Sequence, residues 1–68
     1  MNETSIWTVY GMTCGHCVAS VTEELLEVDG IEAVDVDLPS GAVTVTSAGP
    51  LDPGVVAAAV DEAGYALA

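Results

Sequence analysis

The spacing of apolar positions changes several times along the chain, and each change marks a predicted element. Residues 6–10 form a strand-like run in which Trp7 and Val9 share one face. Apolar residues then recur at spacings of three and four, which predicts an amphipathic helix over residues 18–27. The apolar stripe of this helix consists of Val18, Val21, Leu25 and Val28, and Asp29-Gly30 ends it.

The middle of the chain predicts two further strands joined by a turn. Apolar and acidic residues alternate over residues 34–38, which is typical of a half-buried strand. The Leu-Pro-Ser-Gly sequence of residues 38–41 turns the chain. Val43 and Val45 then alternate with threonines, which indicates the next strand.

A second helix is predicted from its start signal. Asp52 is a favoured N-cap, and Pro53 suits the first helical position. Gly64 ends this helix, and residues 65–67 form a short last strand. The apolar stripe of the helix consists of Val56, Ala59, Val60 and Ala63.

The order of these elements predicts the fold class. Strand, helix, strand, strand, helix, strand is the βαββαβ plan of an α+β, ferredoxin-like fold, with a four-stranded antiparallel sheet and two helices on one face. The 68 residues have room for one domain, residues 1–68, and little room for a large substrate pocket with catalytic groups. We therefore expect a binding domain and not an enzyme.

The charge balance narrows the classes of partner. The chain has eleven acidic residues and no Lys or Arg. It therefore lacks the basic surface that nucleic acid requires, and an anionic membrane surface would repel it. A complementary protein partner would carry Lys or Arg, although the acids also keep a protein soluble and are compatible with a salt-rich cytoplasm.

Two features of the sequence predict where in the cell the protein is found. Residues 1–5 contain neither a positively charged segment nor an apolar one, and no apolar run approaches the length of a membrane span. We therefore expect a cytoplasmic protein without membrane insertion, in a compartment where thiols stay reduced.

Candidate chemistry is concentrated in the two cysteines of the chain, Cys14 and Cys17, which lie between the first strand and the first helix. Two thiolates two residues apart can bind one soft metal ion, such as Cu(I) or Zn(II). We expect Cys14 in the loop and Cys17 in the first turn of the helix, whose N-terminus favours the thiolate form. Neither sulfur is expected to be needed to fill the core. A closed zinc site fits less well because it needs further ligands. A thioredoxin-like redox pair fits less well because the chain is too short for that fold. A structural disulfide fits less well because it needs an oxidising compartment.

The segment Gly11-Met12-Thr13-Cys14-x-His16-Cys17 resembles the metal-binding loop of the heavy-metal-associated domain family. Within this family it is most similar to small bacterial copper(I) chaperones with a Cys-x-His-Cys sequence. The resemblance extends to residues 28–31, to residues 38–41 and to Ala63-Gly64-Tyr65. It implies the βαββαβ fold, with Cys14 and Cys17 as the ligands of Cu(I).

Three neighbouring residues have roles that the resemblance implies. Met12 points into the core and supports the loop rather than binding metal. His16 tunes the two thiols, or takes part in a copper-bridged dimer, without binding the primary ion. Tyr65 lies in a loop beside the metal loop and shields the site.

The resemblance predicts a cytoplasmic copper(I) chaperone that is monomeric without metal. Its partner would be a copper-transporting P-type ATPase, or else a copper-sensing repressor. Two alternatives remain: a metal-binding or regulatory domain from the N-terminus of a metal-transporting ATPase, and a carrier of Hg(II), Zn(II) or Cd(II). The chain length and the first methionine favour the separate chaperone, and the lack of an acid beside the cysteines disfavours zinc and cadmium.

Overall fold

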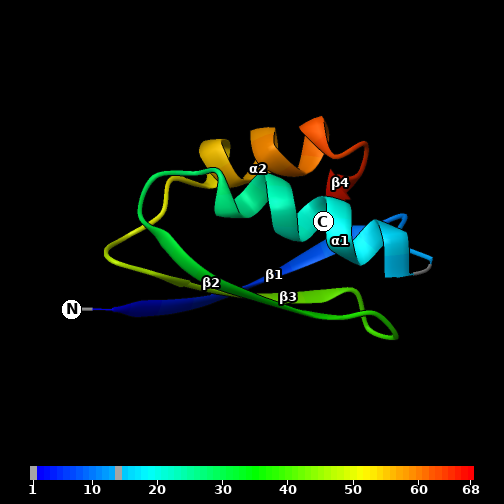
Figure 1. The fold of residues 1–68 in the computed structure, drawn as a ribbon, viewed down its shortest axis with the longest axis horizontal. Helices are drawn as coiled ribbons and strands as arrows, with labels where there is room; N and C mark the ends of the chain where they lie inside the picture. Colours follow the sequence, from blue (N-terminus) through cyan, green and yellow to red (C-terminus); the bar gives the residue numbers. More distant parts are fainter. Residues whose placement is uncertain (1, 14) are drawn as a thin grey trace.

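A computed structural model describes residues 2–13 and 15–68, and these residues form the βαββαβ order that the sequence predicts (Figure 1). The sheet has the strand order β2-β3-β1-β4, and each neighbouring pair is antiparallel. Both helices cover the same face of the sheet (Figure 1), which confirms the ferredoxin-like α+β prediction. Neither helix has the length and apolar character needed to cross a membrane. The elements are β1 (Glu3–Tyr10), α1 (Gly15–Leu26), β2 (Ile31–Asp37), β3 (Ala42–Ser47), α2 (Pro53–Glu62) and β4 (Ala66–Leu67).

The first helix begins earlier than its apolar spacing indicates. It starts at Gly15, and its buried residues are Cys17, Val21 and Leu25, at a regular spacing of four. Val18, which the prediction placed on the buried stripe, is only half-buried. Cys17 is therefore the first buried residue of α1, and the expectation that its sulfur has no part in filling the interior is wrong.

The strand β2 also begins earlier than predicted, because a bulge interrupts its alternation. Ile31 is paired with Ser47 and Ala33 with Thr46, so two residues of β2 oppose one residue of β3. The extra residue lets both Ile31 and Val34 contact the core although they are three positions apart. The simple period of two therefore starts only at Val34.

Both ends of α2 have the predicted signals. The Gly54 N–H donates a hydrogen bond of 2.9 Å to Oδ1 of Asp52, the N-cap, and Pro53 follows it. At the other end Gly64 has a φ of 92°, and its N–H donates to the Asp61 carbonyl at 2.9 Å. The Tyr65 N–H donates to the Val60 carbonyl at 3.1 Å, which completes a Schellman motif. This motif sets the direction in which the chain leaves the helix at Tyr65.

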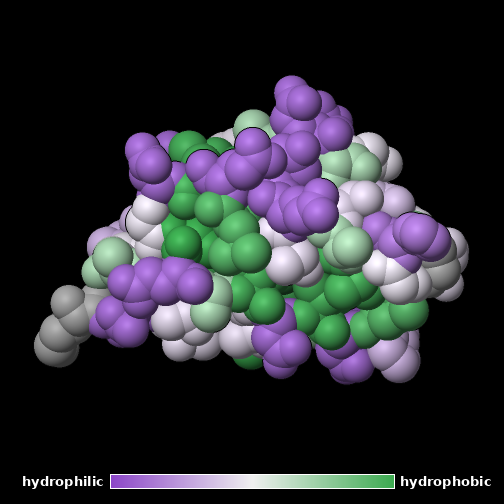
Figure 2. All heavy atoms as spheres, viewed as in Figure 1, coloured by the Kyte–Doolittle hydropathy of each residue, from purple (hydrophilic) through white to green (hydrophobic). Residues whose placement is uncertain are grey.

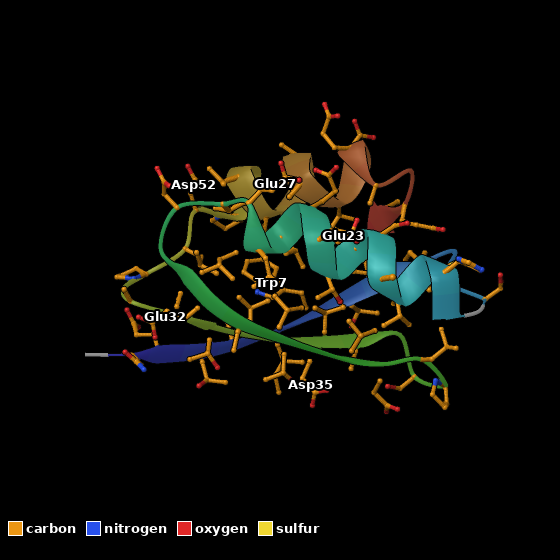
Figure 3. All side chains as sticks on the ribbon, viewed as in Figure 1. Trp7, Glu23, Glu27, Glu32, Asp35 and Asp52 are labelled. Carbon is orange, nitrogen blue, oxygen red and sulfur yellow. The ribbon has the colours of Figure 1, made fainter. Side chains whose placement is uncertain are left out.

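The core lies between the sheet and the two helices and is built mainly from aliphatic side chains. Trp7 is half-buried in this layer (Figure 3), and its indole N–H donates to Ser5 Oγ at 2.9 Å. Among the described residues, Ser47 is the buried polar one, and its hydroxyl donates to the Gly49 carbonyl at 2.7 Å. The buried apolar residues that contact one another are Val9, Val21, Leu25, Ile31, Val43, Val45, Val56, Ala59 and Val60.

Both helices carry acidic side chains, and the sequence contains no Lys or Arg to pair with them. Glu23 projects from α1 and Glu27 follows the last residue of this helix (Figure 3), and hydrophilic residues cover much of the helical layer (Figure 2). Glu24 lies half-buried among these carboxylates. Partial desolvation raises the pKa of Glu24, and the negative charges of Glu27, Glu62 and Glu23 raise it further. The ionised form of Glu24 therefore opposes folding.

Replacing Glu24 with Gln should stabilise the protein at pH 7. The folded state holds the Glu24 proton more tightly than the unfolded state, whose Glu pKa is about 4.3. The penalty is therefore complete above the raised folded pKa and disappears as the pH falls below the unfolded value. Thermal unfolding of E24Q and wild type between pH 3.5 and 7.5 should show a gain in Tm that shrinks towards acid.

The matched control is E3Q, which removes one charge at the exposed start of β1. Its effect on Tm should be smaller and should depend less on pH than that of E24Q. An E24Q protein that is no more stable than E3Q at pH 7 would contradict the prediction.

Candidate metal-binding site

Three segments that are distant in the sequence meet at one end of the sheet. The β1–α1 connection, the β2–β3 hairpin and the α2–β4 turn lie there together (Figure 1). The Val9 N–H donates to the Gly41 carbonyl at 2.9 Å, which joins the hairpin to the end of β1. Pairing of Tyr10 with Ala66 joins β4 to the same end. The end of β1, which leads into the predicted metal loop, is therefore held on both sides.

Cys17 is held in the first turn of α1. Its side chain is 8% exposed, and it lies at the end of the helix that carries partial positive charge. The Cys17 Sγ lies 3.8 Å from Thr13 Oγ1, within hydrogen-bonding distance for sulfur. Cys14, the other predicted ligand, lies outside the described residues.

Tyr65 is placed beside the loop by the end of α2. A Cβ atom added to Gly11 would lie 3.1 Å from Tyr65 Cδ1, so the tyrosine ring packs closely over this glycine. Gly11 has a φ of 96°, a conformation that residues with side chains rarely adopt. The backbone conformation therefore favours glycine at this position, and a side chain here would also have to shift the Tyr65 ring by a few tenths of an ångström.

Met12 and His16 occupy contrasting environments. Met12 is half-buried and packs against the core, whereas His16 is exposed at the start of α1. Across residues 2–13 and 15–68, no three His, Cys, Asp or Glu side chains come together in a group that could hold a metal ion. Roles for Met12, His16 and Tyr65 at a bound metal remain predictions.

The contact between Thr13 and Cys17 is the feature that the sequence reasoning missed. Thr13 is part of the metal-binding motif, but the sequence predictions give its hydroxyl no role. A hydroxyl four residues before a cysteine at the start of a helix is nevertheless a recognisable signal, because Thr side chains commonly bond to groups in the adjoining helical turn. The early start of α1 at Gly15 brings Cys17 into that turn.

Comparisons with known proteins agree with this arrangement. Residues 7–66 match the heavy-metal-associated domain family. The structure resembles that of a protein described as CopZ metallochaperone, with a TM-score of 0.89 and 31% identity over 97% of this chain and 100% of that one. It also resembles a putative copper-ion-binding protein from Bacillus anthracis, with a TM-score of 0.85 and 32% identity over 100% and 97% of the two chains.

A shorter match connects the chain to a curated relative. It is 45% identical over 40 residues to the copper chaperone CopZ of Staphylococcus aureus, and the matched segment spans 59% of each protein. The match to the domain family covers most of the chain and includes Cys17 and Tyr65. The chain therefore belongs to the heavy-metal-associated domain family, a family of metal-binding and not enzymatic domains, as the sequence predicted.

Proposed function

We propose that this protein is a copper(I) chaperone that binds one Cu(I) through Cys14 and Cys17 and passes it to a copper-transporting P-type ATPase. The observation that carries the proposal is the position of Cys17, whose sulfur is held at the N-terminus of α1, three residues after Cys14 in the sequence. The similarity to CopZ copper chaperones supports copper as the cargo. In this proposal residues 1–68 act as a single metal-carrying domain.

The donor set suits a soft, transferable ion. Two thiolates satisfy Cu(I), which accepts low coordination numbers and prefers sulfur to oxygen ligands. The bound unit carries one net negative charge, which the partial positive charge at the N-terminus of α1 offsets in part. Tyr65 over Gly11 limits access to the loop from the side of β4.

Transfer proceeds by exchange of sulfur ligands without a change in the oxidation state of copper. A thiolate of the acceptor first forms a third Cu–S bond, and one Cu–S bond of this protein then breaks. The sulfur that leaves takes up a proton from solvent, and repetition of the exchange moves the ion to the acceptor. Because only two ligands hold the ion at the start, the third bond can form before any ligand departs.

The charge of the chain indicates the surface that an acceptor would present. Eleven carboxylates without Lys or Arg favour a partner face rich in basic residues, on an ATPase domain or on a copper-sensing repressor. We place the exchange in the cytoplasm, where thiols are reduced. The exposed His16 could join a copper-bridged dimer, whereas the metal-free protein would be a monomer.

Metal competition tests the proposed cargo. Reduced protein is titrated with Cu(I), Zn(II), Cd(II) and Hg(II) against chelators of known affinity. Tight binding of one Cu(I), with weak binding of Zn(II) and Cd(II), is the expected result. Strong preference for another of these ions would replace the copper assignment with a carrier of that ion.

Replacing either cysteine with Ser should abolish tight 1:1 binding of Cu(I), because one thiolate alone cannot hold the ion against a competing chelator. C17S should also lower the free energy of unfolding by about 1 kcal/mol, since a hydroxyl replaces a buried sulfur. Copper competition and thermal unfolding measure the two effects.

The matched control for C17S is A19S, which introduces the same residue at an exposed position of the same helix. It should bind copper as wild type does. If folded C17S still bound one Cu(I) tightly, the assignment of Cys17 as a copper ligand would be wrong.

Copper transfer to a basic acceptor should slow as salt increases. Exposed charges are screened over about 8 Å at physiological ionic strength, so added salt weakens attraction between the acidic protein and its partner. Stopped-flow transfer to a soluble metal-binding domain of a copper-transporting ATPase measures the rate. A neutral small thiol is the control acceptor, and equal salt dependence for both acceptors would contradict electrostatic docking.

Tyr65 and His16 should modulate copper exchange without acting as ligands. Y65F and H16A should retain 1:1 binding, while affinity changes by no more than the roughly 10–100-fold that is typical of groups around a metal site. H16A should also reduce any copper-driven dimer, which sizing of the loaded protein detects. Y10F is the control, because Tyr10 is an exposed tyrosine of the sheet at 63% exposure. If Y65F and H16A match Y10F in affinity, exchange rate and size, neither residue serves the site.

A further inference from the structure

We propose that Thr13 is a positioning residue for copper binding, because its hydroxyl holds the sulfur of Cys17 in the orientation that meets the ion. The inference rests on the proposed function and adds a residue to it. The observation behind it is the 3.8 Å contact between Thr13 Oγ1 and Cys17 Sγ. Thr13 is exposed in the loop, whereas Cys17 is buried, so the contact ties a buried ligand to the surface at which copper arrives.

The contact selects among the few orientations that the cysteine can adopt. A cysteine side chain has one rotatable bond with three staggered positions, and one of these is rare inside a helix. A hydrogen bond from the loop therefore needs only to favour one of the two remaining positions. Threonine suits this purpose because its branched Cβ restricts its own rotation.

The direction of the bond follows from the chemistry of the bound state. In the thiol form either atom can donate, as the geometry allows. A metal-binding thiolate has no proton and can only accept, so the Thr13 hydroxyl must then be the donor. A hydrogen bond to an ionised acceptor is stronger than one between neutral groups, and the contact therefore favours the copper-loaded form.

The same contact bears on the transfer step. Exchange requires one sulfur of the protein to stay on copper while the other is replaced by the acceptor. The burial of Cys17 at 8% exposure and its bond to Thr13 both restrict the movement of this sulfur. Loss of the hydroxyl should therefore allow copper to escape more readily to any competing ligand.

The test compares T13V, T13S and the control T8V. Valine has nearly the shape of threonine without the hydroxyl, and serine keeps the hydroxyl. Thr8 is an exposed threonine of β1, so T8V makes the same chemical change on the sheet. Affinity for Cu(I) and the rate of copper loss to a chelator are measured on the reduced, loaded proteins.

T13V should bind Cu(I) about tenfold more weakly, at the lower end of the range for groups that orient metal ligands. It should also lose copper faster, whereas T13S should stay close to wild type and T8V should match it. Rescue by serine separates the hydroxyl from a general packing effect. Wild-type affinity in T13V, or equal loss in T13S and T13V, would overturn the positioning role.

A metal-free measurement separates this inference from the proposed function. The change in unfolding midpoint caused by T13V is compared between the wild-type and C17A backgrounds in a double-mutant cycle. A destabilisation that disappears in C17A supports the contact, and an unchanged destabilisation overturns it. Absence of tight Cu(I) binding in wild type would overturn the proposed function, whereas normal wild-type binding with an unaffected T13V would overturn the Thr13 role alone.

Discussion

Packing of α1 against the sheet is the constraint on which the candidate site depends. Its buried residues, Cys17, Val21 and Leu25, recur every four positions and turn the same side of the helix towards the interior. Val21 and Leu25 are fully buried, so they fix both the rotation of the helix and its distance from the strands. Cys17 stands at the end of this series, and its sulfur is therefore located by the core and not by the loop alone.

The candidate site therefore combines a side chain fixed by the helix, that of Cys17, with a loop that is held by fewer contacts. Burying an apolar side chain of the size of Val or Leu contributes about 1.5–3 kcal/mol, which exceeds what a single loop contact provides. The loop is positioned by weaker means: the Tyr65 ring over Gly11, Met12 against the core and the Thr13 hydroxyl at Cys17. For the proposed copper carrier, this division would keep the sulfur of Cys17 in place while an acceptor approaches the ion.

The sequence was sufficient for the elements whose apolar pattern is regular. The α2 helix was correctly predicted from Asp52 to Gly64, because both its cap and its end are local signals that one or two residues determine. The start of β2 was missed because the bulge at Ile31 breaks the period of two, and such a bulge depends on the strand opposite. Cys17 was correctly predicted in the first turn of α1, whereas the apolar spacing alone placed the start of the helix too late, at Val18, because Gly15 and His16 are exposed and add nothing to the buried stripe.

The charge of the chain explains why so much depends on apolar packing. The chain has eleven acids and no Lys or Arg, so its carboxylates repel one another and lack basic partners. The raised pKa of Glu24, to which neighbouring carboxylates contribute, is one sign of this repulsion. The helices must therefore be held to the sheet by their buried residues against this repulsion. Since Cys17 is one of those residues, a change that loosens the helices also displaces the proposed ligand. Stability and metal binding are thus coupled through one helix, and a substitution at Val21 or Leu25 would affect the site without touching it.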